Sequence, residues 1–186
     1  MVRCTDGTVI RGESVVREVG KAVSRVEVEP SDATAPQGVH SAIEAADVVV
    51  LSPGSLFTNL IPALLGAGVR EALAHFPGPV VYAANVMTQP GETVGFTVSD
   101  HLLALERHVG SVVTDVLVHS GELPEQLVAR YEAEGAAPVE VDREQVEKLG
   151  IRVREGHLLS DEVGTSVRHD PHRLAEEMYE AALVRL

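Results

Sequence analysis

Three runs of apolar residues, separated by segments with helical spacing, constrain the fold more than any other feature of the 186-residue sequence. The runs occupy residues 47–52, 79–84 and 112–119, and none of them alternates regularly between apolar and polar side chains. Continuous apolar runs are typical of parallel strands that helices cover on both faces. We therefore expect an α/β protein in which the three runs are neighbouring strands of a mostly parallel sheet with right-handed crossovers.

The first 38 residues follow a different pattern. Residues 2–11 read as an antiparallel hairpin, because Asp6-Gly7 tolerates the positive φ angles of a tight turn. Residues 23–29 alternate strictly, as a half-exposed strand does, and residues 30–38 form a polar loop with two prolines. We expect one domain over residues 1–186, with residues 1–38 as a hairpin and edge-strand extension and residues 39–186 as the α/β core.

Capping signals place the remaining helices. Thr97 and Asp100 form a capping box, Asp142 is an expected N-cap, and Asp170 followed by Pro171 is another. The helices expected from these signals and from apolar spacing cover residues 39–46, 56–65, 69–75, 97–108, 124–134, 142–150 and 174–186. Short strands are expected at residues 139–141, 151–154 and 157–160.

The net charge of −13 limits the partners of the chain. A surface this acidic repels phosphate backbones and anionic membranes, so we expect neither a nucleic acid nor a membrane as partner. Cys4 is the single cysteine, which excludes an internal disulfide and cysteine-rich zinc sites. The sequence has neither an 18-residue apolar run nor a charged-then-apolar leader, so we expect a soluble, cytoplasmic protein.

The loop after the first apolar run carries short polar side chains at the place where open α/β folds bind ligands. Gly54 lets a ligand approach the backbone, and Ser55, Thr58 and Asn59 offer hydrogen-bonding groups. Free N–H groups at the start of the following helix would favour an anion such as phosphate. The alternative is that Ser55 only caps the helix, because the segment matches neither a Walker motif nor a full dinucleotide fingerprint.

The loop after the second run should leave the sheet at the same edge. Its hydrogen-bonding side chains are Asn85, Thr88, Gln89, Glu92 and Thr93. Loops held on a rigid sheet often carry function, although an ordinary long polar loop is an equally good interpretation of this segment.

Three other patterns are weaker. Ser99-Asp100-His101 cannot act as a triad, because consecutive helical residues point in different directions. His169 and His172 flank Asp170, but a helix cap with a solvated first turn explains them more simply than a metal site. The acidic stretch 132–147 is most simply a solvated face.

Several of these segments together resemble one family. Residues 51–58, LSPGSLFT, followed by Ile61-Pro62, are similar to a segment of the gluconeogenesis-factor family, often called YvcK. Residues 85–93, NVMTQPGET, are similar to its other hallmark. The resemblance covers essentially the whole chain and continues through Asp6-Gly7-Thr8, Gly12-Glu13-Ser14, Ser99-Asp100-His101, Pro138-Val139, Asp142, Leu149-Gly150 and Arg168-His169-Asp170.

The resemblance implies a Rossmann-like three-layer fold that binds a nucleotide, with a UDP-sugar such as UDP-N-acetylglucosamine as the expected ligand. It implies a regulator of carbon metabolism, cell-wall synthesis and cell shape with no established catalysis, and no catalytic residue or metal ligand is assigned. The wider superfamily includes 2-phospho-L-lactate transferase (CofD) of deazaflavin-coenzyme synthesis, which would require magnesium, and this enzyme is the alternative. A third interpretation is a fragment that folds and associates but binds nothing.

The sequence departs from the family pattern at its beginning. Family members start with a strand and a Gly-rich GGGTG loop, followed by an Asp-Asp-Gly-Gly segment, and the 186 residues contain none of these. The chain therefore resembles the C-terminal part of a family member that lacks the first βα unit. From this we expect weak binding of the UDP-sugar and association into a homodimer through the uncovered side of the sheet.

Overall fold

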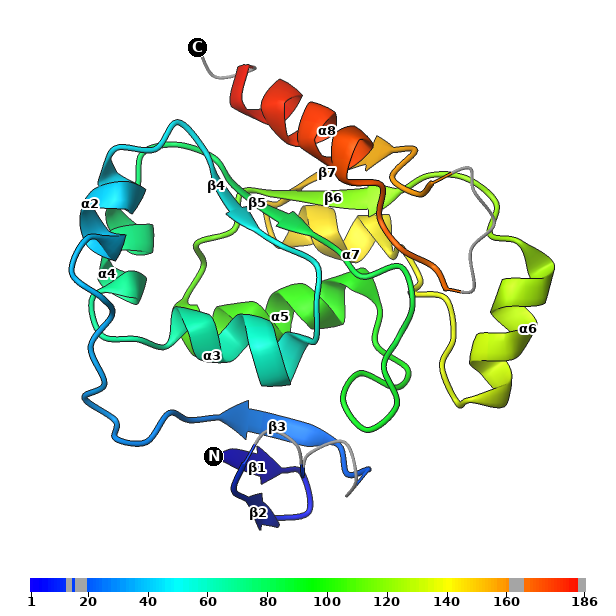
Figure 1. The fold of residues 1–186 in the computed structure, drawn as a ribbon, viewed down its shortest axis with the longest axis horizontal. Coiled ribbons are helices and arrows are strands. Elements are labelled where there is room, and N and C mark those ends of the chain that lie inside the picture. Colours follow the sequence, from blue (N-terminus) through cyan, green and yellow to red (C-terminus); the bar gives the residue numbers. More distant parts are fainter. Residues whose placement is uncertain (13–14, 16–19, 161–165, 184–186) are drawn as a thin grey trace.

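A computed structural model describes residues 1–186 except 13–14, 16–19, 161–165 and 184–186. Its centre is a four-stranded parallel sheet in the order β4-β5-β6-β7 (Figure 1). The strands are β4 (Val49–Leu51), β5 (Val80–Ala83), β6 (Asp115–His119) and β7 (Arg152–Gly156). The three apolar runs are therefore neighbouring parallel strands, as predicted, and β7 extends the sheet by one strand.

Helices cover both faces of this sheet, which gives the three expected layers (Figure 1). One face carries the crossover segments, and the other carries the last helix. The helical segments are α2 (Val39–Glu44), η1 (Leu56–Leu60), α3 (Ile61–Leu64), α4 (Val69–His75), α5 (Val98–Val109), α6 (Glu125–Ala133), α7 (Arg143–Lys148) and α8 (Pro171–Leu183).

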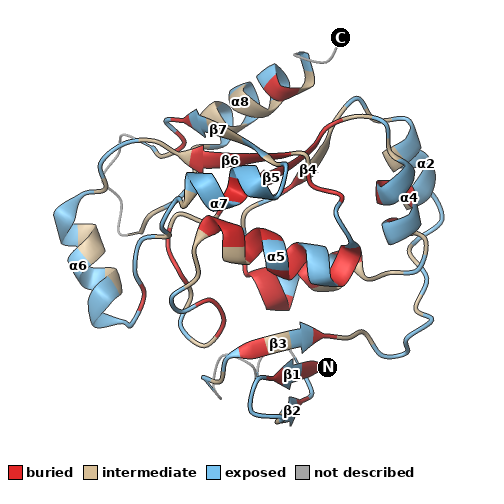
Figure 2. Cartoon of the chain, turned by 180° about the vertical axis from the view of Figure 1, so that it is seen from behind, coloured by how far each residue is buried: buried red, intermediate tan, exposed pale blue. Residues whose placement is uncertain are grey.

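Side chains alternate between the two faces of the sheet and build one core on each. Tyr82 and Val116 belong to the larger cluster, which includes Leu105 of α5. Val81 and Leu117 belong to the second cluster, which includes Ala181 of α8. Figure 2 shows buried residues concentrated in β6 and α5, while α6 and α7 are largely exposed.

The N-terminal strands form a sheet of their own. β1 (Val2–Cys4), β2 (Val9–Ile10) and β3 (Val23–Val26) are antiparallel in the order β2-β1-β3. The hairpin is confirmed, but it is not an extension of the parallel sheet. Its alternating strands have one apolar face, and that face packs against the helical layer, where the N–H of Val26 donates to Nε2 of His108 over 2.9 Å.

The segment predicted as a helix over residues 56–65 contains a turn of a different kind. The N–H groups of Asn59 and Leu60 both donate to the carbonyl of Ser55, so the chain opens into the π-helical turn η1 before α3 begins. Pro62 lacks an N–H and cannot continue a regular helical ladder back to residue 58, which accounts for the change of geometry at this point.

Two predicted short strands are wrong. Residues 139–141 and 157–160 make single bridges instead of ladders, between Thr97 and Glu140 and between Leu159 and His169. The partners of these two segments lie in loops, not in strands, so the pairing does not continue into a ladder of hydrogen bonds.

Asp142 occupies the N-cap position of α7, as expected, but only the carboxylate of Asp170, before α8, makes capping hydrogen bonds to its own helix. The carboxylate of Asp142 makes no capping bond to α7 and instead accepts from the N–H and hydroxyl of Ser99 and the hydroxyl of Thr97, at the start of α5. The capping box of Thr97 and Asp100 is present, so two carboxylates stabilise this helix end.

Candidate functional site

The loops that follow β4 and β5 lie side by side at the carboxyl edge of the sheet. The amide side chain of Asn85 joins them: its Nδ2 donates to the carbonyl of Gly54 over 2.8 Å, and its Oδ1 accepts from the N–H of Gly54 over 3.1 Å. Nε2 of Gln89 donates to the hydroxyl of Ser55 over 3.0 Å. The predicted meeting of the two loops at one edge is therefore correct.

A buried carboxylate makes a second connection between the loops. Glu92 is only 3% exposed, and its two oxygens accept from the N–H of Phe57 over 3.2 Å and from the hydroxyl of Thr58 over 3.0 Å. Because these donors belong to η1, Glu92 fixes the position of the π-helical turn relative to the second loop.

Two threonines fold the second loop on itself and onto the chain beyond β6. Oγ1 of Thr93 accepts from the N–H of Gln89 over 2.9 Å, and Thr93 is fully buried. Thr88 pairs with Ala137 through its N–H and through its hydroxyl. These bonds give the loop a defined shape.

A cavity of about 740 Å³, here called the polar cavity, opens between the two loops. Six of the nine predicted residues line it: Gly54, Ser55, Asn59, Asn85, Thr88 and Gln89. The other three, Thr58, Glu92 and Thr93, do not line this cavity, but their hydrogen bonds shape the loops around it. Its remaining lining residues are Pro53, Val86, Met87, Tyr131, Val167, Arg168 and His169.

None of these seven residues is among the predicted site residues, and three of them, Tyr131, Arg168 and His169, carry polar side chains. Arg168 is exposed and supplies the charged group of the lining, while the hydroxyl of Tyr131 accepts from the N–H of Val167 over 3.2 Å. Burial and the nearby His119 lower the pKa of His169, so its imidazole is neutral at pH 7. Residues 168–170 had been recognised as a motif, but nothing in the sequence indicated that they would lie opposite the two loops.

Polar atoms without partners point to a ligand-binding role for this cavity. In the described part of the chain, Oε1 of Gln89 and Nε2 of His169 are buried and have no hydrogen-bond partner. Unpaired buried polar atoms carry a free-energy penalty, so a ligand that supplies hydrogen bonds at this place would relieve it.

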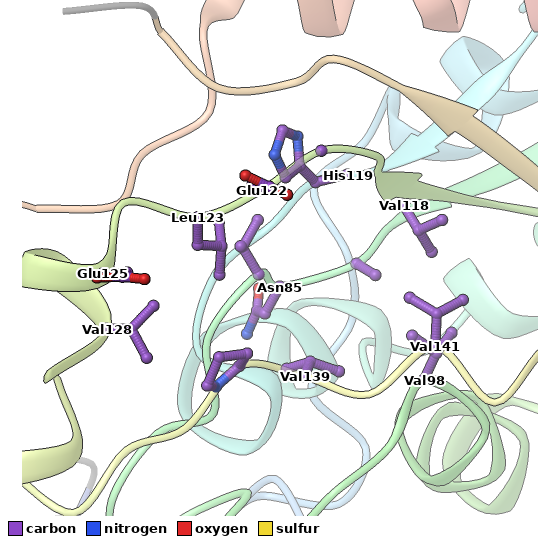
Figure 3. Close-up of a pocket in the computed structure, with 14 residues that line it drawn as sticks. Asn85, Val98, Val118, His119, Glu122, Leu123, Glu125, Val128, Val139 and Val141 are labelled. Carbon is purple, nitrogen blue, oxygen red and sulfur yellow. The ribbon is translucent and has the colours of Figure 1, made fainter. Parts of the chain in front are cut away.

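A second cavity, here called the apolar cavity, lies next to the first and has a volume of about 530 Å³ (Figure 3). Asn85 and Val86 border both cavities. The other lining residues of the apolar cavity are Ala84, Val98, Val118, His119, Gly121, Glu122, Leu123, Glu125, Val128, Pro138, Val139 and Val141.

The weaker sequence patterns have structural roles. Ser99 bonds to Asp142, and His101 is buried with its ring against Phe96 and Tyr82, so residues 99–101 do not form a triad. Among the residues that the structure describes, no group of three His, Cys, Asp or Glu side chains is arranged to hold a metal ion. Within the same ranges, no helix has the length and apolar character that crossing a bilayer requires.

Comparison with known proteins places this geometry in a family. The model of the family described as 2-phospho-L-lactate transferase CofD matches residues 1–159. The chain is 36% identical to the gluconeogenesis factor of Bacillus subtilis over 171 residues, which are 91% of this chain and 54% of that protein. It is 41% identical to a putative gluconeogenesis factor of Deinococcus radiodurans over 183 residues, or 97% of this chain and 37% of that protein.

A solved structure agrees with the fold. The crystal structure of a UPF0052 family member from Bacillus halodurans superposes with a TM-score of 0.91 at 37% identity, covering 96% of this chain and 57% of that one. The chain thus spans between 37% and 57% of the length of these relatives. Because the family model covers most of the chain, this protein belongs to the CofD family, and the relatives named above are gluconeogenesis factors of that family.

Proposed function

We propose that this protein is a nucleotide-sugar-binding regulator of the gluconeogenesis-factor type, which links carbon metabolism to cell-wall synthesis and cell shape. The observation that supports the proposal is the polar cavity, where short polar side chains of two loops face an arginine. A cavity of several hundred Å³ with a few convergent polar groups is the usual form of a small-molecule site.

The chemistry of the lining fits a nucleotide-sugar. Arg168 provides a guanidinium for a phosphate, and among the residues that the structure describes no acidic side chain lines the polar cavity to oppose a negative ligand. The amides of Asn59 and Gln89 and the hydroxyl of Ser55 suit the hydroxyl groups of a sugar, because each can both donate and accept. In an otherwise acidic protein, this is where an anionic ligand meets a local positive charge.

Titration calorimetry with UDP-N-acetylglucosamine tests the proposal. Arg168→Ala should weaken binding about 10- to 100-fold, because a hydrogen bond to a charged group contributes about 1.5–3 kcal/mol. Arg107→Ala is the matched control: Arg107 is an exposed arginine of α5 that does not line the polar cavity, so its loss should leave the affinity unchanged. Absence of binding at millimolar ligand, or equal losses in both variants, would refute the proposal.

The second candidate is a phospholactyl transferase, and the match of the CofD family model favours it. That reaction would require magnesium, and the described residues do not offer a carboxylate or histidine group suited to hold the ion. Mass spectrometry after incubation with a deazaflavin acceptor, an activated phospholactyl donor and magnesium tests this candidate, because transfer adds the mass of the phospholactyl group to the acceptor.

A further inference from the structure

The apolar cavity has the form of a binding site in its own right. Its lining comes from five separate parts of the chain: the end of β5 with the loop after it, the start of α5, the end of β6 with the loop after it, the first turns of α6, and the segment 138–141. Figure 3 shows Leu123, Val128 and Val139 around one space, with Val118 and Val141 grouped beside it. The volume of about 530 Å³ lies in the range of small-ligand pockets.

Hydrogen bonds between the walls keep this cavity open. The N–H of Val139 donates to the carbonyl of Val86 over 2.9 Å, and the N–H of Val98 donates to the carbonyl of Glu140 over 2.9 Å. The segment 138–141 is therefore fixed to both the loop after β5 and the start of α5. A cavity with fixed walls binds a ligand without first paying the entropy of ordering them.

The charge of the rim is opposite to that of the polar cavity. Glu122 and Glu125 line the cavity with exposed side chains. His119 adds no positive charge at pH 7, because Nδ1 accepts from the N–H of Leu158 and burial lowers the pKa of the ring. The described lining of the apolar cavity contains no arginine or lysine, so its rim repels phosphates and carboxylates and attracts cations.

We propose that the apolar cavity is a second small-molecule site, which takes a molecule with an apolar body and a protonated amine. The valine and leucine side chains would enclose the body, and Glu122 and Glu125 would hold the ammonium group at the rim. Asn85 separates this site from the polar cavity, so the two ligands would lie next to each other. The proposal does not depend on what the polar cavity binds.

Three probes of similar size test the ligand class with the full 186-residue chain: 2-phenylethylamine, 2-phenylethanol and phenylacetate. Methyl resonances of labelled valines report the place of binding. The amine should shift the signals of Val128, Val139 and Val141 and bind at least about tenfold more tightly than the acid, with the alcohol in between. Shifts confined to the loops of the polar cavity, equal affinity for amine and acid, or no shift at about 10 mM of any probe would overturn the proposal.

Two sets of variants separate the role of the charges from that of the cavity. The double variant Glu122→Gln/Glu125→Gln should lose the preference for the amine over the alcohol. The control, Glu132→Gln/Glu144→Gln, removes the same charge from exposed positions outside the cavity and should keep that preference. A preference that survives the first double variant, or that both double variants abolish, would contradict the assignment of the rim carboxylates.

Filling the cavity gives an independent result. Val128→Trp places a large side chain into the space from α6 and should abolish binding of all three probes, while UDP-N-acetylglucosamine binding to the polar cavity is measured in parallel. Retained probe binding in a folded Val128→Trp protein would overturn the proposal. If that variant does not fold, the glutamate variants decide the question alone.

Discussion

Replacing Glu92 should destabilise the protein more than replacing any exposed glutamate. The carboxylate is 3% exposed and accepts from the N–H of Phe57 and the hydroxyl of Thr58. In Glu92→Ala both donors lose this acceptor in a buried place, and each such bond to a charged group contributes about 1.5–3 kcal/mol. We expect a loss of about 3–5 kcal/mol in the free energy of unfolding.

The loss is measurable by thermal and urea unfolding. For a chain of this size, 1 kcal/mol corresponds to about 2–4 °C in the melting temperature, so Glu92→Ala should melt roughly 6–20 °C below the parent. Glu92→Gln retains the volume and one accepting oxygen and should lose about half as much. Glu71→Ala is the control, since its exposed carboxylate makes one capping bond to the N–H of Gly68 and its removal should cost about 0.5–1 kcal/mol.

A double-mutant cycle with Thr58→Val isolates the side-chain bond. If the bond is made, the two changes should be non-additive by about 1 kcal/mol, because each alone already breaks it. A melting temperature for Glu92→Ala within about 2 °C of the parent would show that the buried carboxylate does not hold the loops together, and the reasoning above would be wrong.

Two further predictions concern stability in acid. Burial raises the pKa of Asp142, but hydrogen bonds from Ser99 and Thr97 outweigh this effect and hold the pKa below its usual value. The ionised carboxylate therefore stabilises the folded protein above about pH 4, and this contribution is lost as the pH falls through the pKa of the folded state. Asp142→Asn should accordingly flatten the decline of the urea midpoint between about pH 7 and pH 3. Burial lowers the pKa of His108, so the folded protein binds fewer protons there than the unfolded chain and its stability falls below about pH 6.5. Hydrogen exchange at the N–H of Val26, corrected for its intrinsic rate, should therefore accelerate between pH 7 and pH 5, and in His108→Phe it should be fast at both values.

The sheet was predictable because its signal is local. A valine-rich run such as residues 79–84 predicts a buried strand from its own composition, without knowledge of its distant neighbours, and β5 is buried at every position. The same holds for the turn at Asp6-Gly7 and the cap at Asp170, whose carboxylate accepts from the N–H groups of residues 172 and 173.

What could not be predicted depends on partners distant in the sequence. Asp142 has the local signature of a helix cap, but its carboxylate accepts hydrogen bonds from Ser99 and Thr97, which lie 43 and 45 positions earlier in the sequence. Likewise, Arg168 and Tyr131 lie on the polar cavity because α6 and the segment before α8 return to the carboxyl edge of the sheet, which no local pattern encodes. Sequence reasoning therefore found the two loops of the site and missed the wall that faces them.

Strands β4 to β7 stand in the sheet in the order in which the ribosome produces them. Each new strand can pair with the strand completed just before it, so the parallel sheet can grow while the chain is still being synthesised. The small antiparallel sheet instead depends on a residue made much later, because the N–H of Val26 donates to His108, 82 residues further along the chain. The hydrogen bond that joins the small sheet to α5 can therefore form only after residue 108 has been synthesised.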